Sequence, residues 1–515
     1  MATYAAPNTT EDGRENIAPM VTTSWGQSSP YNNMCPTIRA QHCQTGCVAT
    51  AMAQIMNYHR WPLTTESIPG YASYSYSLNV PALDPVSFAW DKMLDSYTSS
   101  ATNEEREAVA RLMLYCGVSV EMDYGLSTSA AWEGDAARAL VNYFGYAHSV
   151  REVFRNMYGP TAWKNLIYRE LAAGRPVFYG GMPSGFLHQF VCDGYKDGLF
   201  HMNMAWSFSA NDYYDLDTID QYPEGQSAII GIHRADDTDS AYGETFSADG
   251  LKFTVIGSET VTVSGVEANF TGHLSVPAVV EHGEHTWTVN TIDYAAFEDS
   301  TGITSISLPA TVDVIGTRMV LGCTNLESFE VDASNPWYKA EDGVLMSHDG
   351  KEMVAYPIDK QDAEYVVPED VVTLPASFFR SNQHLQQVTL PASLTTLDIL
   401  TFRGCTSLQK IISNNPSPKA IEDMAFDDET YQTATLVVPQ GSANAYRRKD
   451  GWKLFQHIVE QSDDETSVLD ITPDSSDHVD TGIQTHYNLS GRQAKQSEAG
   501  IHIVKTASIV KKVIK

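Results

Sequence analysis

The sequence predicts an α+β domain followed by a β-rich repeat domain, and three observations support this order. Helical patterns occupy much of the chain before residue 177 and give way to apolar strand patterns up to residue 206. After residue 245, β-branched residues become frequent and an internal repeat occurs. The length of 515 residues exceeds what one hydrophobic core supports, so separate domains are expected.

Composition shifts divide the chain further. Residues 235–240 read Ala-Asp-Asp-Thr-Asp-Ser, and residues 461–482 are rich in Asp, Ser and Thr. Such polar stretches bury too little apolar surface to fold alone, so they are expected to be linkers. The predicted organisation is a first domain at 1–235, a linker at 236–244, a repeat domain at 245–460, an acidic linker at 461–482 and a small β module at 483–515.

The overall composition excludes several classes of function. The formal net charge of −31 argues against nucleic acid as a partner, because a phosphate backbone would be repelled. No apolar run approaches the roughly 18 residues of a membrane-spanning helix. The seven cysteines form neither a dense disulfide framework nor a paired CxxC metal signature. We therefore expect no transmembrane segment, no metal site and no cofactor.

The first predicted helix covers residues 47–61 and is followed by a proline. Val48, Met52 and Ile55 follow the i, i+4, i+7 spacing of a buried helical face. Cys47 lies at the start of this helix, where the positive end of the helix dipole favours a thiolate over a thiol. The alternative is that Cys47 is a small residue of the core.

Three further helical patterns follow, and then strands. The helical patterns cover residues 104–116, 132–144 and 163–173, and residues 177–179 form a short strand pattern. Apolar runs at 188–195 and 199–206 flank a Lys-Asp-Gly turn. This arrangement predicts a hairpin of two buried strands.

Four polar residues occur in the chain order that papain-type nucleophilic catalysis uses. Gln27 lies in a loop ahead of Cys47, and a glutamine beside a nucleophile can donate a hydrogen bond to the oxyanion of a tetrahedral intermediate. His188 opens the first hairpin strand and Asn203 lies on the second, so the hairpin can bring imidazole and amide together. The order Gln, Cys, His, Asn predicts a thiol nucleophile, although each residue alone also fits a structural role.

Four segments around these positions form a recognisable set. They are Trp-Gly-Gln at 25–27 with Pro-Tyr-Asn at 30–32, Thr-Gly-Cys-Val-Ala-Thr-Ala-Met-Ala-Gln-Ile-Met-Asn-Tyr-His at 45–59, Val-Ser-Val-Glu-Met-Asp-Tyr-Gly at 118–125, and His-Gln-Phe-Val-Cys-Asp-Gly-Tyr at 188–195. Together they resemble the streptopain family of secreted bacterial cysteine peptidases, over about residues 17–233. The resemblance implies a papain-like fold, in which a helical half carries the cysteine and a twisted antiparallel sheet carries the histidine.

The same resemblance implies roles for individual residues. Cys47 would be the nucleophile, His188 the general base and acid, and Gln27 the oxyanion-hole donor. Asn203 and Trp206 would belong to the shell that orients His188. The resemblance also implies protein or peptide substrates and a secreted or cell-surface location, with the signal peptide and prosegment not present in this chain.

Two segments depart from the family pattern. The family shows Gly-His-Ala around the histidine and Asn-Trp-Gly-Trp-Gly-Gly after it, whereas this sequence has Leu-His-Gln at 187–189 and Asn-Met-Ala-Trp-Ser-Phe at 203–208. Met204 stands where the family has a tryptophan, so the aromatic ring expected near the imidazole is missing. Larger residues in place of the family's glycines leave less space for the backbone of a substrate. Besides a working endopeptidase, two alternatives stay open: a catalytically impaired peptidase-like domain in a surface adhesion or binding protein, and an acyltransferase.

The second domain contains a repeat. Gly-Cys-Thr-Asn-Leu at 322–326 matches Gly-Cys-Thr-Ser-Leu at 404–408, and within this longer offset Phe379 with Leu385 recurs 23 residues later as Phe402 with Leu408. This period is in the leucine-rich repeat range, and the strand ends resemble the BspA-like repeats of bacterial surface proteins. One repeat cannot bury its apolar face alone, so the repeats must stack. The resemblance implies a host or cell-surface protein ligand.

Three smaller predictions complete the chain. Residues 335–357 interrupt the repeats with Asp-Gly turns and predict a β-hairpin excursion. Cys323 and Cys405 occupy equivalent repeat positions and are expected in the repeat core rather than in a disulfide. The segments 487–493 and 500–505 predict the small C-terminal module, which is similar to sorting-related modules of exported bacterial proteins. The alternative is a last hairpin with a basic end at Lys511, Lys512 and Lys515.

Overall fold

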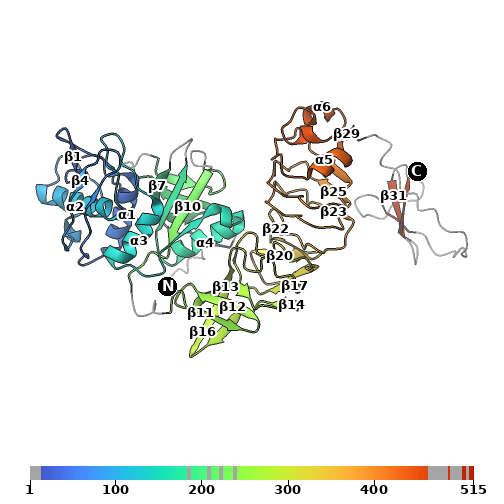
Figure 1. The fold of residues 1–515 in the computed structure, drawn as a ribbon, viewed down its shortest axis with the longest axis horizontal. Helices are drawn as coiled ribbons and strands as arrows, with labels where there is room; N and C mark the ends of the chain where they lie inside the picture. Colours follow the sequence, from blue (N-terminus) through green and yellow to red (C-terminus); the bar gives the residue numbers. More distant parts are fainter. Residues whose placement is uncertain are drawn as a thin grey trace, which may run out of the picture. The chain divides into compact units, whose positions relative to one another are not determined.

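The computed structural model describes residues 13–182, 187–205, 210–219, 224–235 and 241–461, together with three strands near the C-terminus. The chain forms two compact units, Met1–Gln461 and Ser462–Lys515. Figure 1 shows the elements of each unit. The second unit contains β30 (Thr485–Tyr487), β31 (Ile501–Lys505) and β32 (Val510–Ile514), which pair antiparallel in that order.

The first domain is built on a six-stranded antiparallel sheet with the order β5-β10-β6-β7-β8-β9 (Figure 1). Its strands are β5 (Arg151–Phe154), β6 (Val177–Met182), β7 (His188–Lys196), β8 (Leu199–Asn203), β9 (Asp212–Tyr214) and β10 (Glu224–Ile230). Its helices are α1 (Cys47–His59), α2 (Asn103–Ser119), α3 (Glu133–Phe144) and α4 (Pro160–Ala172), with 3-10 turns η1 (Trp90–Lys92) and η2 (Arg155–Met157). Short strand pairs are formed by β1 (Thr37–Ile38) with β2 (Gln41–His42) and by β3 (Tyr71–Ala72) with β4 (Asn79–Val80).

Both faces of this sheet are buried. Phe178, Val191 and Ile229 are partners in register and belong to the hydrophobic core formed with α1, α2 and α3. Tyr179 and Phe190 point to the other face and pack in the core beneath α4. Successive side chains of a strand point to opposite faces of the sheet. Because both faces are covered here, every position of a central strand is buried, and this explains the unbroken apolar runs from which the hairpin was predicted. The predicted papain-like fold is confirmed.

The predicted elements of this domain are present with shifted ends. The first helix ends at His59 because Arg60 adopts the left-handed conformation at φ 48°. The strands β5, β9 and β10 have no counterpart in the sequence analysis, although β10 lies between β5 and β6. β5 and β9 have only four and three residues, and β10 is apolar only at 228–230, so none of them shows enough alternation to define a period.

The repeat domain begins with a mixed sheet that has both antiparallel and parallel pairs, and it continues as parallel ladders (Figure 1). Its strands up to the excursion are β11 (Thr245–Ala248), β12 (Leu251–Val255), β13 (Thr260–Val266), β14 (Gly272–Ser275), β15 (Val279–His282), β16 (His285–Ile292), β17 (Ile303–Leu308), β18 (Val314–Ile315) and β19 (Ser328–Val331). After the excursion follow β23 (Glu364–Val366), β24 (Thr373–Leu374), β25 (Gln387–Leu390), β26 (Thr396–Leu397), β27 (Lys410–Ser413), β28 (Thr435–Val438) and β29 (His457–Glu460), with α5 (Asp428–Thr433), α6 (Ala443–Tyr446) and η4 (Trp452–Leu454).

Strand register confirms the 23-residue period. Ser305 pairs with Ser328, and Gln387 pairs with Lys410, in parallel ladders. The rings of Phe379, Phe402 and Phe426 stack at successive centroid distances of 4.8 Å, because equivalent residues of neighbouring repeats lie above one another.

The repeat cysteines and the excursion also follow the predictions. Cys323 and Cys405 are free and fully buried, and each Sγ donates to a backbone carbonyl oxygen at 3.0 Å. The excursion consists of β20 (Tyr338–Glu341), β21 (Val344–Ser347) and β22 (Met353–Ala355), which pair antiparallel. Most of both predicted linkers, namely residues 236–240 and 462–482, lies outside the described residues.

The repeat domain contacts the peptidase-like domain along α4. Val314 of β18 belongs to the hydrophobic core beneath α4. The guanidinium of Arg169 pairs with the Asp313 carboxylate at 3.1 Å, and the Asn165 amide donates to the Asp313 carbonyl at 2.6 Å. The domain boundaries stay a prediction, but the two domains share buried surface.

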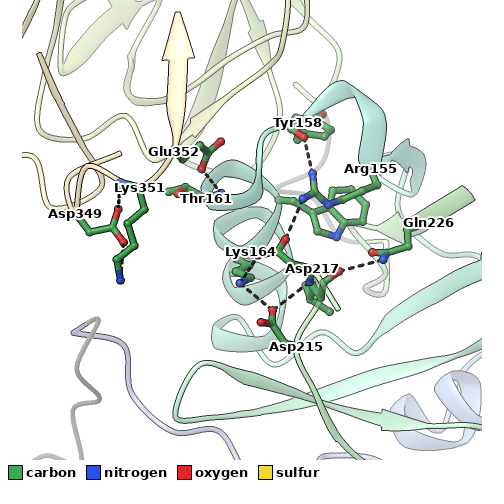
Figure 2. Close-up of polar contacts among 12 residues, drawn as sticks. Arg155, Tyr158, Thr161, Lys164, Asp215, Asp217, Gln226, Asp349, Lys351 and Glu352 are labelled. Carbon is green, nitrogen blue, oxygen red and sulfur yellow. Dashed lines mark hydrogen bonds and ion pairs between the residues drawn. The ribbon is translucent and has the colours of Figure 1, made fainter. Parts of the chain in front are cut away.

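A carboxylate from the excursion lies at the start of α4. Figure 2 shows Glu352, whose Oε2 accepts the backbone N–H of Thr161 at 2.8 Å. Gly159 leaves room for this approach, because a Cβ there would collide with the Glu352 carboxylate. One turn further along the helix, Lys164 pairs with Asp215 at 2.9 Å and Asp217 at 2.6 Å, which fixes the loop after β9 (Figure 2).

No helix among these described residues is long and apolar enough to cross a membrane.

Candidate active site

Cys47 is the first residue of α1, as predicted. The preceding residue Gly46 has φ 84°, and a Cβ there would meet the Met122 side chain at 2.8 Å and the Ser129 carbonyl at 3.0 Å. Only glycine therefore fits this position. Residues 48–56 of the helix are buried without exception, so α1 is held in the centre of the domain and Cys47 at its partly exposed end.

The electrostatic environment of Cys47 differs from the expectation. Burial raises the pKa of the thiol, and the negative charge of Glu133 adds to this rise. The backbone N–H groups of Gln189 and Val48 lower the pKa, but they do not outweigh burial. The pKa of Cys47 is therefore raised overall, and the predicted net lowering by the helix terminus is wrong.

His188 opens β7 and is held by a backbone carbonyl. Its Nε2 lies 3.0 Å from the carbonyl oxygen of Met204, and the side chain is 4% exposed. A carbonyl only accepts, so Nε2 carries the proton of the neutral ring, and Nδ1 carries the lone pair that can accept a second proton. Burial lowers the pKa of His188 to about 4, and the bond to Met204 opposes this shift. The ring is therefore uncharged at neutral pH.

The strand β7 carries His188 and also contacts the start of α1 through its next residue. Gln189 follows His188 in the chain, and its backbone N–H acts on the Cys47 thiol. Cys47 therefore lies beside the residue that follows His188, where α1 contacts β7, and the pairing of the two catalytic side chains stays a prediction.

Gln27 lies beside the same helix terminus. Its carbonyl accepts the backbone N–H of Thr45, two residues before Cys47, at 3.1 Å. The loop is anchored by Trp25, which is fully buried and whose indole N–H donates to the Leu94 carbonyl at 2.8 Å. The half-buried Gln27 is therefore in the right neighbourhood for an oxyanion donor, and this role stays a prediction.

Asn203 supports its neighbour Met204, whose carbonyl contacts His188. Its Nδ2 donates to the Thr23 carbonyl at 2.6 Å, and its Oδ1 accepts the backbone N–H of Ala205 at 3.3 Å. These bonds fix the turn that presents the Met204 carbonyl to His188. Trp206, the other residue expected in this shell, lies outside the described residues.

The sequence analysis missed Gln54, which joins three segments of the site. Gln54 lies on α1. Its Oε1 accepts hydrogen bonds from the Thr23 hydroxyl at 3.0 Å and from the backbone N–H of Trp25 at 3.3 Å. Its Nε2 donates to Asn203 Oδ1 at 3.4 Å. Gln54 lies seven residues after Cys47, which places both on one helix face. A polar residue inside an otherwise apolar helical face was the available signal.

The sequence analysis also missed a buried carboxyl beside Cys47. Glu133 is 3% exposed at the start of α3, accepts from the Ser227 hydroxyl, and lies 3.3 Å from Gln189 Nε2. Burial and the charge of Glu152 raise the pKa of Glu133 to about 7, while Ser227 and Gln189 oppose this rise. Among the described residues no cluster of three or more His, Cys, Asp or Glu side chains fits a metal ion.

Comparison with known proteins identifies relatives of both domains. Residues 25–214 match the model of the Peptidase C10 family, and residues 282–339 and 363–444 match six copies of the BspA type leucine rich repeat region. The chain is 33% identical over 241 residues to streptopain of Streptococcus pyogenes, which covers 40% of this chain and 60% of streptopain. The chain therefore spans less than two thirds of that relative.

Two further relatives come from other bacteria. The thiol protease/hemagglutinin PrtT of Porphyromonas gingivalis is 30% identical over 286 residues, covering 50% of this chain and 31% of PrtT. The structure of the interpain A cysteine protease of Prevotella intermedia is 32% identical with a TM-score of 0.41, covering 45% of this chain and 100% of that one. The resemblance given by the sequence motifs is confirmed.

Proposed function

Since its first domain belongs to the Peptidase C10 family, we propose that this protein is a secreted or cell-surface cysteine endopeptidase whose repeats bind a protein or surface partner. The main support is the Met204 carbonyl at 3.0 Å from His188 Nε2, because this bond assigns the proton of the neutral ring to Nε2 and the basic lone pair to Nδ1.

In this mechanism His188 Nδ1 takes the Cys47 proton, and the sulfur attacks the carbonyl carbon of the scissile peptide bond. The S–C bond forms while the C=O electron pair moves to oxygen, where the Gln27 amide donates a hydrogen bond. The C–N bond then breaks, and His188 returns the proton to the leaving amine. Water, deprotonated by His188, hydrolyses the thioester and restores the thiol.

The proposal is tested by the hydrolysis of unfolded casein. We expect Cys47→Ala and His188→Ala to abolish hydrolysis to a similar degree, because nucleophile and base act as a unit. Casein hydrolysis that persists in folded Cys47→Ala would overturn the assignment of the nucleophile.

A second candidate function is a binding protein with an impaired peptidase domain. Burial raises the pKa of Cys47 and lowers that of His188 to about 4, and both shifts favour an uncharged pair. Such a protein would bind its partner through the stacked repeats, which offer an extended surface. It would not react with an irreversible, thiol-directed peptidase inhibitor.

A further inference from the structure

The carboxyl of Glu133 is buried behind the two proposed catalytic residues, on elements that the mechanism does not use. It starts α3, and its Oε2 is held by the Ser227 hydroxyl from β10 and by Gln189 Nε2 from β7 at 3.3 Å. Burial of a carboxyl is costly unless hydrogen bonds or a neutral form compensate, so this position is unusual for a structural glutamate.

Gln189 connects this carboxyl to the nucleophile. Its side chain contacts Glu133, its backbone N–H acts on the Cys47 thiol, and the preceding residue is His188. Gly180 of β6 leaves space for the Gln189 amide, because a Cβ at Gly180 would collide with it. The amide is therefore confined between Gly180 and Glu133, on the residue whose backbone faces Cys47.

The buried side chains of Glu133 and Gln189 have more acceptor atoms than nearby hydrogen-bond donors. Oε1 of Glu133 and Oε1 of Gln189 are both buried and have no hydrogen-bond partner among the described residues. The charged groups that face Glu133 are Glu152 on β5 and the Cys47 thiol on α1, and in the described part of the chain no cation forms an ion pair with it. A neutral carboxyl supplies the missing O–H donor, whereas an ionised one adds a charge beside the sulfur.

We propose that Glu133 is a positioning residue for Cys47: protonated, it holds Gln189 against the nucleophile, and ionised, it destabilises the thiolate. The inference rests on the proposed thiol chemistry of Cys47. The raised pKa of Glu133, about 7, places this change near neutral pH. Because a negative neighbour opposes a second negative charge, the Cys47 thiolate forms at a higher pH in the native protein than it would beside a neutral residue.

The test follows alkylation of Cys47 by iodoacetamide against pH in the full chain, with the labelled peptide quantified by mass spectrometry. The thiolate displaces iodide, so the rate reports thiolate without requiring peptide hydrolysis. We expect Glu133→Gln to shift the midpoint of labelling downward by about 0.5–1 pH unit. Asp135→Asn, on the same helical turn, is the matched control and should leave the midpoint unchanged.

A second neutral variant, Glu133→Ala, keeps the proposal testable if the glutamine variant does not fold, and it must shift the midpoint in the same direction. A midpoint that stays at the native value in either folded variant, or that moves equally in Asp135→Asn, overturns the role of Glu133. Failure of the proposed peptidase function is a separate outcome, seen as absent casein hydrolysis at every pH while labelling still titrates.

Discussion

At the scale of single residues, the site depends on groups that hold one another rather than on one polarised side chain. Asn203 fixes the turn of Met204, Met204 fixes the tautomer of His188, and Gln54 ties Asn203 to α1. In this buried site each polar group has few alternative hydrogen-bond partners, so the removal of one side chain leaves another polar group unsatisfied. The site is thus prearranged before substrate arrives.

The oxyanion role of Gln27 gives a prediction at this scale. We expect Gln27→Ala to lower kcat on a small peptide substrate by roughly 10²-fold, because the amide would donate only as charge develops on oxygen. The KM should change little by comparison. Gln41→Ala, which removes an exposed amide from the same region, is the control. An unchanged kcat would assign Gln27 to the surface of the loop.

Residue type explains what the sequence could and could not reveal about the site. Cys47 and His188 were predictable because a helix-start cysteine and a strand-start histidine occur within family motifs. The Met204 carbonyl was not, because every residue carries one. Glu133 resembled an ordinary acid in the first turn of a helix, and only the strands that cover it make it buried.

At the scale of elements, α4 is stabilised from both domains. Its partners Asp313 and Glu352 lie about 150 to 190 residues further along the chain, so no local pattern could predict them. By contrast, the 23-residue ladder could be predicted, because stacked repeats pair only with their neighbours in sequence.

Glu352 provides the test of this contact. Glu352→Ala removes the acceptor for the Thr161 N–H at the start of α4, and we expect it to lower the free energy of unfolding by about 1–2 kcal/mol. Urea denaturation followed by tryptophan fluorescence measures this loss. Lys351→Ala, which removes the neighbouring exposed side chain, should have little effect. Equal urea midpoints for the two variants would show that the contact does not stabilise the fold.

At the scale of the whole molecule, we predict that the repeat domain contributes to the stability of the peptidase domain but not to its catalysis. Every residue assigned to the chemistry precedes the repeat domain, whereas Val314, Asp313 and Glu352 of the repeat domain cover α4. A chain ending at residue 235 should therefore fold with a lower melting temperature but keep the kcat/KM of the full chain for small peptides. An insoluble product, or a folded one without turnover, would mean that the repeats complete the peptidase domain.

The central claim is that Cys47 is a working nucleophile, and titration with an irreversible thiol-directed peptidase inhibitor tests it most directly. We predict that one inhibitor molecule per chain, located at Cys47 by mass spectrometry, abolishes casein hydrolysis, and that His188→Ala loses this labelling. The six other cysteines are buried and should stay unmodified in the folded chain. Casein hydrolysis that survives complete modification of Cys47, or a folded protein in which Cys47 never reacts, would contradict the claim.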